Sequence, residues 1–195
     1  MLESPILIKK YDPNWKTEFE RLEKVLLQNI STEISRIEHV GSTSIENLYA
    51  KPIIDIDIVI EDNDLLLQKV ISELATLEYS HLGNLGISGR EAFKRLNSKT
   101  PNNKSKNIWH NHNLYLCKEG SIGLLNHLNF RNHLRNDSNA VIRYGNLKKE
   151  LAQKFPYNID AYIDGKTSFI IEILERCGMN KNSTKTINTE NRIPK

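Results

Sequence analysis

Two aspartates, Asp55 and Asp57, stand one residue apart in the strongly apolar run "PIIDIDIVI". The run is rich in β-branched residues and predicts a buried strand. Residues i and i+2 of a strand project from the same face, so the two carboxylates should lie about 6–7 Å apart. Such a pair repels unless a cation compensates it, and Mg²⁺ is held by one or two carboxylates plus substrate phosphates. Asp55 and Asp57 therefore predict a site for Mg²⁺ or Mn²⁺; the alternative is a solvated pair at a sheet edge.

A Gly-Ser-Thr-Ser turn precedes this strand. Gly41 permits a tight turn, and Ser42 and Thr43 offer hydroxyl and N–H groups at the start of a short helix predicted over 42–49. Free N–H groups at a helix start bind anions. Gly41, Ser42 and Thr43 are therefore predicted to bind phosphate, unless the segment is only a capped turn. An anion site followed by a metal-binding pair is what the handling of a nucleoside triphosphate requires.

The elements that must position these residues follow from periodicity and turn signals. We predict an α/β (α+β) fold, with a small mixed β-sheet flanked by helices and a helical C-terminal half. One domain should span 1–178, its α/β part being 1–120 and its helical part 121–178, and the polar tail 179–195 should be disordered. The predicted strands are 6–11 (at an edge), 34–41, 52–60 and 110–120. The predicted helices are 13–30 (capped by Asp12), 62–78, 121–136, 138–154 and 158–177. The predicted turns and loops are 83–96 and 98–107.

Composition narrows the function classes. The 195 residues match one domain, and a net charge of +3 is too small to argue for nucleic acid or a membrane. Two cysteines do not make a disulfide framework, and the N-terminus does not resemble a signal peptide. No apolar stretch approaches the roughly 20 residues that span a bilayer. We therefore expect a cytoplasmic protein with no membrane partner.

Several stretches resemble the GrpB family of bacterial proteins over residues 6 to 178. They are "YDPNW", "HVGSTSIENLYAKPIIDIDIVI", "GISGREAFKR", "FRNHLR", "YGNLKKELA" and "YIDGKTSFI". That family is grouped with the DNA polymerase beta-like nucleotidyltransferases, whose pattern is a Gly-Ser turn followed by Asp-x-Asp on a strand. Here twelve residues separate Ser42 from Asp55. The resemblance implies a sheet of nucleotidyltransferase type, with Ser42 contacting the triphosphate and Asp55 and Asp57 holding Mg²⁺. It further implies transfer of a nucleoside monophosphate, with pyrophosphate leaving.

The resemblance weakens at the third carboxylate that such sites carry on a neighbouring strand. The strand predicted at 110–120 offers the same-face pair His110 and His112 where an acid is expected. A neutral imidazole can act as a base, so His112 is a candidate for a catalytic role, unless both histidines merely begin the strand. Loss of the acid would also suit a catalytically silent nucleotide- or coenzyme-A-related binding domain. Some family members are joined to a dephospho-CoA kinase, which favours this alternative.

Basic residues complete the predicted site. Arg131, Lys148 and Lys166 fall within the family-like motifs, and Lys51 stands at the mouth of the aspartate strand. We predict that these four contact phosphate, the alternative for each being a solvated surface. Basic and aromatic residues do not interleave as in single-strand binders, which argues against nucleic acid. The expected ligand is a nucleoside triphosphate or a coenzyme-related small molecule; neither the acceptor nor the oligomeric state follows from the sequence.

Overall fold

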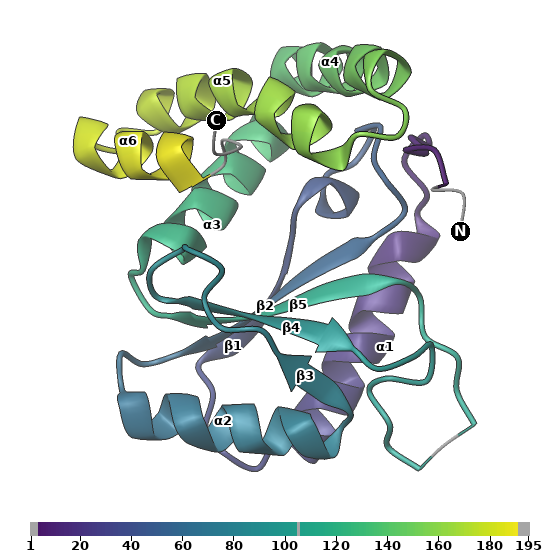
Figure 1. Ribbon diagram of the computed structural model, residues 1–195, viewed down its shortest axis with the longest axis vertical. Coiled ribbons are helices and arrows are strands. Elements are labelled where there is room, and N and C mark those ends of the chain that lie inside the picture. The colour runs from purple at the N-terminus through teal and green to yellow at the C-terminus, as the bar shows by residue number, and fades with distance from the viewer. Residues whose placement is uncertain (1–3, 105, 191–195) are drawn as a thin grey trace.

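A five-stranded mixed sheet forms the centre of the protein (Figure 1). The computed structural model describes residues 4–104 and 106–190. The strand order is β1-β2-β5-β4-β3, with β2 and β5 parallel and the other neighbours antiparallel. The strands are β1 Arg36–Val40, β2 Ile54–Ile60, β3 Tyr79–His81, β4 Arg90–Arg95 and β5 His112–Lys118. The predicted architecture, a mixed sheet flanked by helices and followed by a helical half, is confirmed.

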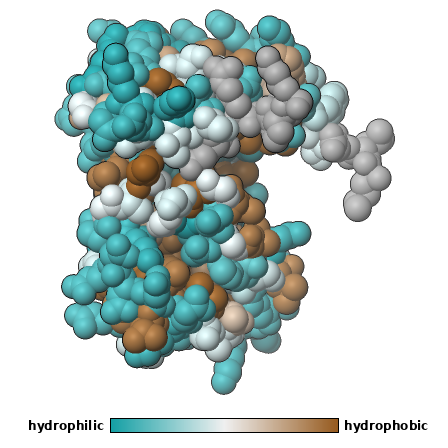
Figure 2. Space-filling model, turned by 60° about the vertical axis from the view of Figure 1, so that its left-hand side comes forward, coloured by the Kyte–Doolittle hydropathy of each residue, from teal (hydrophilic) through white to brown (hydrophobic). Residues whose placement is uncertain are grey.

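Helices cover both faces of the sheet, and a helical group lies beyond one of them (Figure 1). Helices α1 and α2 pack on one face of the sheet. Helix α3 crosses the other face, and α4, α5 and α6 gather next to α3. The helices are α1 Asn14–Asn29, α2 Asp64–Thr76, α3 Ile122–Asn136, α4 Ser138–Lys154, α5 Ile159–Arg176 and α6 Lys181–Glu190. Figure 2 shows the surface narrowing between the helical half and the sheet half. No helix among the described residues is long and apolar enough to cross a membrane.

The two faces of β2 differ in chemistry because side chains alternate along a strand. Ile54, Ile56 and Ile58 are fully buried in the core formed with α1 and α2. Asp55 and Asp57 therefore project from the opposite face, toward α3 and the helical half. A small apolar cluster that includes Val59, Cys117 and Leu124 covers the far end of that face. The sheet thus places its acidic residues where the two halves of the protein meet.

Three predicted elements differ from the structure at the N-terminal half. Residues 6–11 are not a strand; they hold only an isolated bridge between Lys9 and Ala50. The helix predicted over 42–49 is a single 3₁₀ turn, Ser42–Ser44. The glycine-rich segment 83–96 includes strand β4, because glycines confined to its first half leave Arg90–Arg95 free to pair with β5.

The C-terminal tail also differs from its prediction. Residues 181–190 form α6, which contacts α5, whereas we predicted disorder; 191–195 lie outside the described residues. The Asn180 side chain caps the helix by accepting from the Ser183 backbone N–H at 2.9 Å. Thr184 and Ile187 lie one turn apart, and both are buried. Two buried positions in an otherwise polar segment are too few to predict an amphipathic helix from the sequence, because the helix α5 on which they pack is not visible there.

Candidate functional site

Both aspartates of β2 face the junction between the sheet and the helical half. Asn113 of β5 lies beside Asp55 in the parallel register, and its amide donates to Asp55 Oδ1 at 2.7 Å. Asp57 is fully buried, with Oδ2 at 2.8 Å from His127 Nδ1 of α3. Its other oxygen, Oδ1, is buried without a hydrogen-bond partner among the described residues. Burial raises the pKa of Asp55, against the lowering effect of the Asn113 hydrogen bond.

The turn that follows β1 rests directly against Asp55. Gly41 has φ +66° and ψ −170°, a conformation that L side chains rarely adopt. A Cβ at this position would lie 2.1 Å from Asp55 Oδ2. Glycine is therefore required both for the backbone and for the approach to the carboxylate. The three-residue turn is too short to have a helix dipole. An anion at this position would therefore contact the turn itself and not the N-terminus of a helix.

Three lysines and an arginine surround Asp55 on the cavity side. Lys148 is 2% exposed, and its Nζ lies 3.0 Å from Ser42 Oγ. Burial, and then the charge of Lys166, lower the pKa of Lys148 well below its ordinary value. Burial, and then Lys51, lower the pKa of Lys166 to about 8. Burial also lowers the pKa of Lys51. With Arg90, these lysines form a group that we call the basic cluster: Lys51, Arg90, Lys148 and Lys166.

The basic cluster and Asp55 line one cavity of about 390 Å³. No member of the cluster forms an ion pair in the described part of the chain. The cavity is also lined by Gly41 and by the polar side chains of Ser42, Asn113, Tyr115, Asn126, His127, Tyr144 and Tyr162. Basic side chains that have no ion-pair partner among the described residues lie around a single carboxylate, and this makes the cavity suited to an anionic ligand.

Three residues that were predicted to belong to the site do not line the Asp55 cavity: His112, Arg131 and Thr43. The prediction that places His112 at the site is wrong. His112 is 3% exposed and points to the α1–α2 face, where its Nε2 lies 2.6 Å from the Tyr79 hydroxyl. Burial lowers the pKa of His112 to about 3. The reason is parity: the register pairs His112 with Ile54, so Asn113 and Tyr115 share the face of Asp55 and Asp57.

Arg131 and Thr43 are also placed away from the cavity. Arg131 Nη1 donates to Glu38 Oε2 at 2.6 Å and to the His39 carbonyl at 2.9 Å, which ties α3 to β1. Thr43 donates to the Ile53 carbonyl at 3.3 Å and lies 3.0 Å from His39 Nε2. Both were predicted to contact phosphate, and both instead hold the scaffold together. Long-range partners of this kind cannot be read from local sequence.

Sequence reasoning missed Asn113 and His127. Asn113 became visible only once the parallel register with β2 was known. His127 stands one helical turn before Arg131, so the two share a side of α3, but nothing in the sequence distinguished it. Tyr115 also lines the cavity, and the Arg90 guanidinium lies 4.5 Å from its ring centroid.

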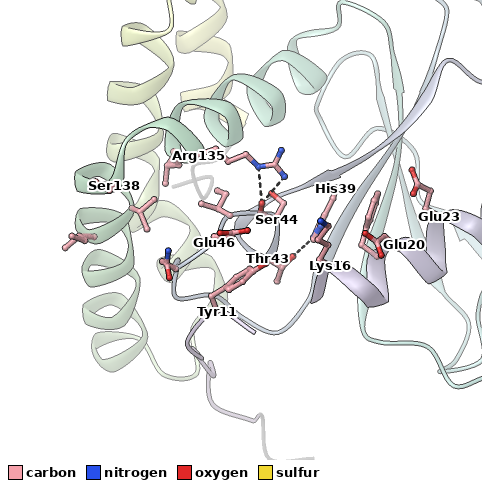
Figure 3. Close-up of a pocket in the computed structure, with 16 residues that line it drawn as sticks. Tyr11, Lys16, Glu20, Glu23, His39, Thr43, Ser44, Glu46, Arg135 and Ser138 are labelled. Carbon is pink, nitrogen blue, oxygen red and sulfur yellow. Dashed lines mark hydrogen bonds between the residues drawn. The ribbon is translucent and has the colours of Figure 1, made fainter. Parts of the chain in front are cut away.

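A second cavity, of about 920 Å³, lies on the other side of the turn (Figure 3). It shares no lining residue with the Asp55 cavity. Arg135 donates from Nε and Nη2 to the Ser44 carbonyl at 3.1 and 2.9 Å, and His39 meets Thr43, so this side braces the turn (Figure 3). Although it is larger, it contains neither aspartate nor any member of the basic cluster, and we place the candidate site in the smaller cavity.

Comparisons with known proteins agree with the family resemblance. The family model described as "GrpB protein" matches residues 5–176. The UPF0157 protein YqkA of Bacillus subtilis is 32% identical over 160 residues, which cover 82% of this chain and only 43% of that protein. The glutamate-rich protein GrpB of Alkalihalophilus pseudofirmus is 28% identical over 87% of this chain and 94% of its own. The crystal structure of conserved protein GrpB from Enterococcus faecalis aligns at TM-score 0.73 and 32% identity, covering 88% of this chain and 96% of that one. The chain belongs to the GrpB family.

Proposed function

We propose that the Asp55 cavity binds a nucleoside triphosphate with Mg²⁺ or Mn²⁺ and transfers the nucleoside monophosphate to a hydroxyl-bearing acceptor. The observation that carries the proposal is the basic cluster, which has no ion-pair partner among the described residues and faces Asp55 across one cavity. A polyphosphate would supply the missing negative charge, and desolvated lysine and arginine side chains hold phosphate oxygens strongly.

The residues present fit a metal that arrives with phosphate. Asp57 Oδ1 is buried without a partner, and such an orphaned oxygen suits a cation ligand. Asp55 lies on the same face two residues away. Among the described residues no group of three or more histidine, cysteine, aspartate or glutamate side chains could hold a metal alone. Two carboxylates plus substrate phosphates are a common Mg²⁺ set, and the bound ion would neutralise phosphate charge and help pyrophosphate leave.

The second candidate is a domain that binds a nucleotide or coenzyme-A-related ligand without transfer. Asn113 favours it, because an amide stands beside Asp55 where the family pattern would place a third acid. An amide cannot accept the proton of an acceptor hydroxyl as a carboxylate can. The two candidates share the same ligand site and differ only in chemistry.

Calorimetric titration with the four common nucleoside triphosphates and coenzyme A, with and without Mg²⁺, tests the binding. We expect metal-dependent binding of a triphosphate that is lost in Asp55→Asn. Asp62→Asn is the matched control, because Asp62 is exposed and pairs with Lys118 away from the cavity. Pyrophosphate release in the presence of hydroxyl acceptors then separates transfer from binding. Nucleotide binding without pyrophosphate release supports the second candidate. Metal-dependent binding that survives Asp55→Asn contradicts the role of Asp55 as a metal ligand, which both candidates share.

A further inference from the structure

The larger cavity, of about 920 Å³, has no part in the proposed function, and we call it the Glu23 cavity. Its wall comes from α1, β1, the residues of the turn, the end of α3 and α4. Its volume lies within the range of small-molecule sites. Much of the wall is apolar, with Phe19, Ile45, Leu134, Val141 and Ile142. The Glu23 cavity can therefore hold the apolar part of a small organic ligand, and its polar groups decide which kind.

His39 supplies a buried hydrogen-bond acceptor in this wall. It is 8% exposed, and its Nε2 lies 3.0 Å from Thr43 Oγ1. Thr43 donates its single hydroxyl proton to the Ile53 carbonyl at 3.3 Å, so Nε2 is the donor in the contact with Thr43. Burial, and then the charges of Arg135 and Arg131, lower the pKa of His39 to about 3. The ring is therefore neutral, and Nδ1 carries a lone pair that meets no donor among the described residues. A buried acceptor of this kind indicates a ligand that donates a hydrogen bond.

Two carboxylates of α1 add negative charge to the wall that His39 forms. Phe19 and Glu23 lie one helical turn apart, and the Phe19 ring stacks on the His39 ring with the centroids 4.6 Å apart. Glu20 and Glu23 are three positions apart, a spacing at which like charges on a helix repel. Burial, and then the charge of Glu20, raise the pKa of Glu23. Although Lys16 lines the same wall, neither carboxylate forms an ion pair in the described part of the chain. A positive group on a ligand would relieve this repulsion.

The end of the Glu23 cavity at α4 has a different character. In Figure 3 Glu46 and Arg135 lie toward α4, and Glu20 and Glu23 lie toward α1. Glu46 and Arg135 have opposite charges, so their end carries no net charge, whereas Glu20 and Glu23 outweigh Lys16 at the other. The apolar wall at α4 is the edge of one core cluster, with Ile45, Leu134 and Val141. This division suits a ligand that carries one positive group on an apolar body.

We propose that the Glu23 cavity binds a small primary amine with an apolar body, and that the bound amine stabilises the turn Ser42–Ser44. The ammonium group donates to His39 Nδ1 and lies against the carboxylates of Glu20 and Glu23. The apolar body lies against the wall at α4. Because the Glu23 cavity and the Asp55 cavity share no lining residue, this inference does not rest on the proposed function.

The turn connects the two cavities. Thr43 and Ser44 line the Glu23 cavity, whereas Gly41 and Ser42 line the Asp55 cavity. The backbone hydrogen bonds of the turn are long, at 3.3 Å from Ser44 N to the Gly41 carbonyl and 3.4 Å from Ile45 N to the Ser42 carbonyl. A turn held by such weak bonds opens locally, and a ligand that binds only the closed form reduces that opening. An amine in the Glu23 cavity therefore acts as an effector of the turn.

NMR titration of the isotope-labelled protein tests the binding with three probes of similar shape: phenethylamine, phenethyl alcohol and phenylpropionate. We expect the amine to bind at least about tenfold more tightly than the other two, because hydrogen bonds to charged groups are the stronger ones. The double variant Glu20→Gln, Glu23→Gln should fold, since it removes a like-charge pair, and should lose this preference. Glu18→Gln is the matched control, because Glu18 lies on the same helix but pairs with Arg21 and does not line the cavity. Equal affinity for the three probes, no binding of the amine, or a preference that persists in the double variant overturns the proposed site.

Amide hydrogen exchange tests the effect on the turn. Phenethylamine at about ten times its dissociation constant should slow exchange of the Ser44 and Ile45 amides about tenfold in the wild-type protein. The same concentration should leave both rates unchanged in the Glu20→Gln, Glu23→Gln variant. Unchanged exchange in wild-type protein that binds the amine overturns the effect on the turn. Neither measurement uses a nucleotide, so failure of this inference and failure of the proposed function are separate results.

Discussion

Gly41→Ala would place a methyl group where the Asp55 carboxylate lies. The added Cβ would be 2.1 Å from Oδ2 and 2.8 Å from Cγ of Asp55. The backbone conformation, φ +66° and ψ −170°, costs a non-glycine residue of order 1–3 kcal/mol. Displacing the partly buried carboxylate of Asp55 is overpacking, which costs a further 1–3 kcal/mol or so. We therefore expect the free energy of unfolding to fall by about 2–6 kcal/mol.

Gly120→Ala separates the two contributions. Gly120 has φ +71°, but an added Cβ there would meet nothing within 4 Å. Its loss of stability should therefore be the backbone term alone, about 1–2 kcal/mol. Urea unfolding of both variants measures the difference, which reports the clash with Asp55. Adding Asp55→Ala to each removes the carboxylate, although it keeps the Asp55 Cβ at 2.9 Å, and should recover part of the lost stability in the Gly41→Ala background only. Equal losses in the two glycine variants, or no coupling in the double mutant, would refute the close approach of turn and carboxylate.

Three further predictions concern charge, the scaffold and the tail. Since the pKa of Lys166 is lowered to about 8, the unfolded chain binds more protons between pH 8 and its ordinary value near 10.4; unfolding free energy should rise with pH across that window. Lys166→Met should flatten this rise and add up to about 3 kcal/mol at pH 7. Urea titrations at pH 7.5 and 9.5 that show the same change in unfolding free energy for both proteins would contradict the lowered pKa of Lys166. Arg131→Met should cost about 3 kcal/mol, because Glu38 loses a buried partner, yet leave nucleotide affinity unchanged by calorimetry; lost affinity in a folded variant would return Arg131 to the site. Ile187→Ala should cost about 2 kcal/mol, since Ile187 is 2% exposed, whereas the exposed Lys185→Ala should cost almost nothing; equal chemical denaturation curves would mean that α6 does not dock.

Local periodicity explains which parts of the fold could be predicted. Side chains alternate on a strand whatever its partners are, so the shared face of Asp55 and Asp57 followed from their spacing alone. Helices α3, α4 and α5 followed from apolar positions three and four apart. Segments whose pattern was weak or broken, namely 42–49, 83–96 and 181–190, were mispredicted, because their structure depends on what they contact.

By itself the sequence determined the strand that carries two carboxylates, the glycine turn before it and the amphipathic helices after it. Only the tertiary structure decided which other residues meet them. The parallel register of β5 on β2 places Asn113, and not His112, beside Asp55, and a shift of one residue would reverse that choice. The packing of α4 brings Lys148 to Ser42 across 106 positions of chain. Contacts between residues so far apart are selected by the packing of whole elements, and no local pattern encodes them.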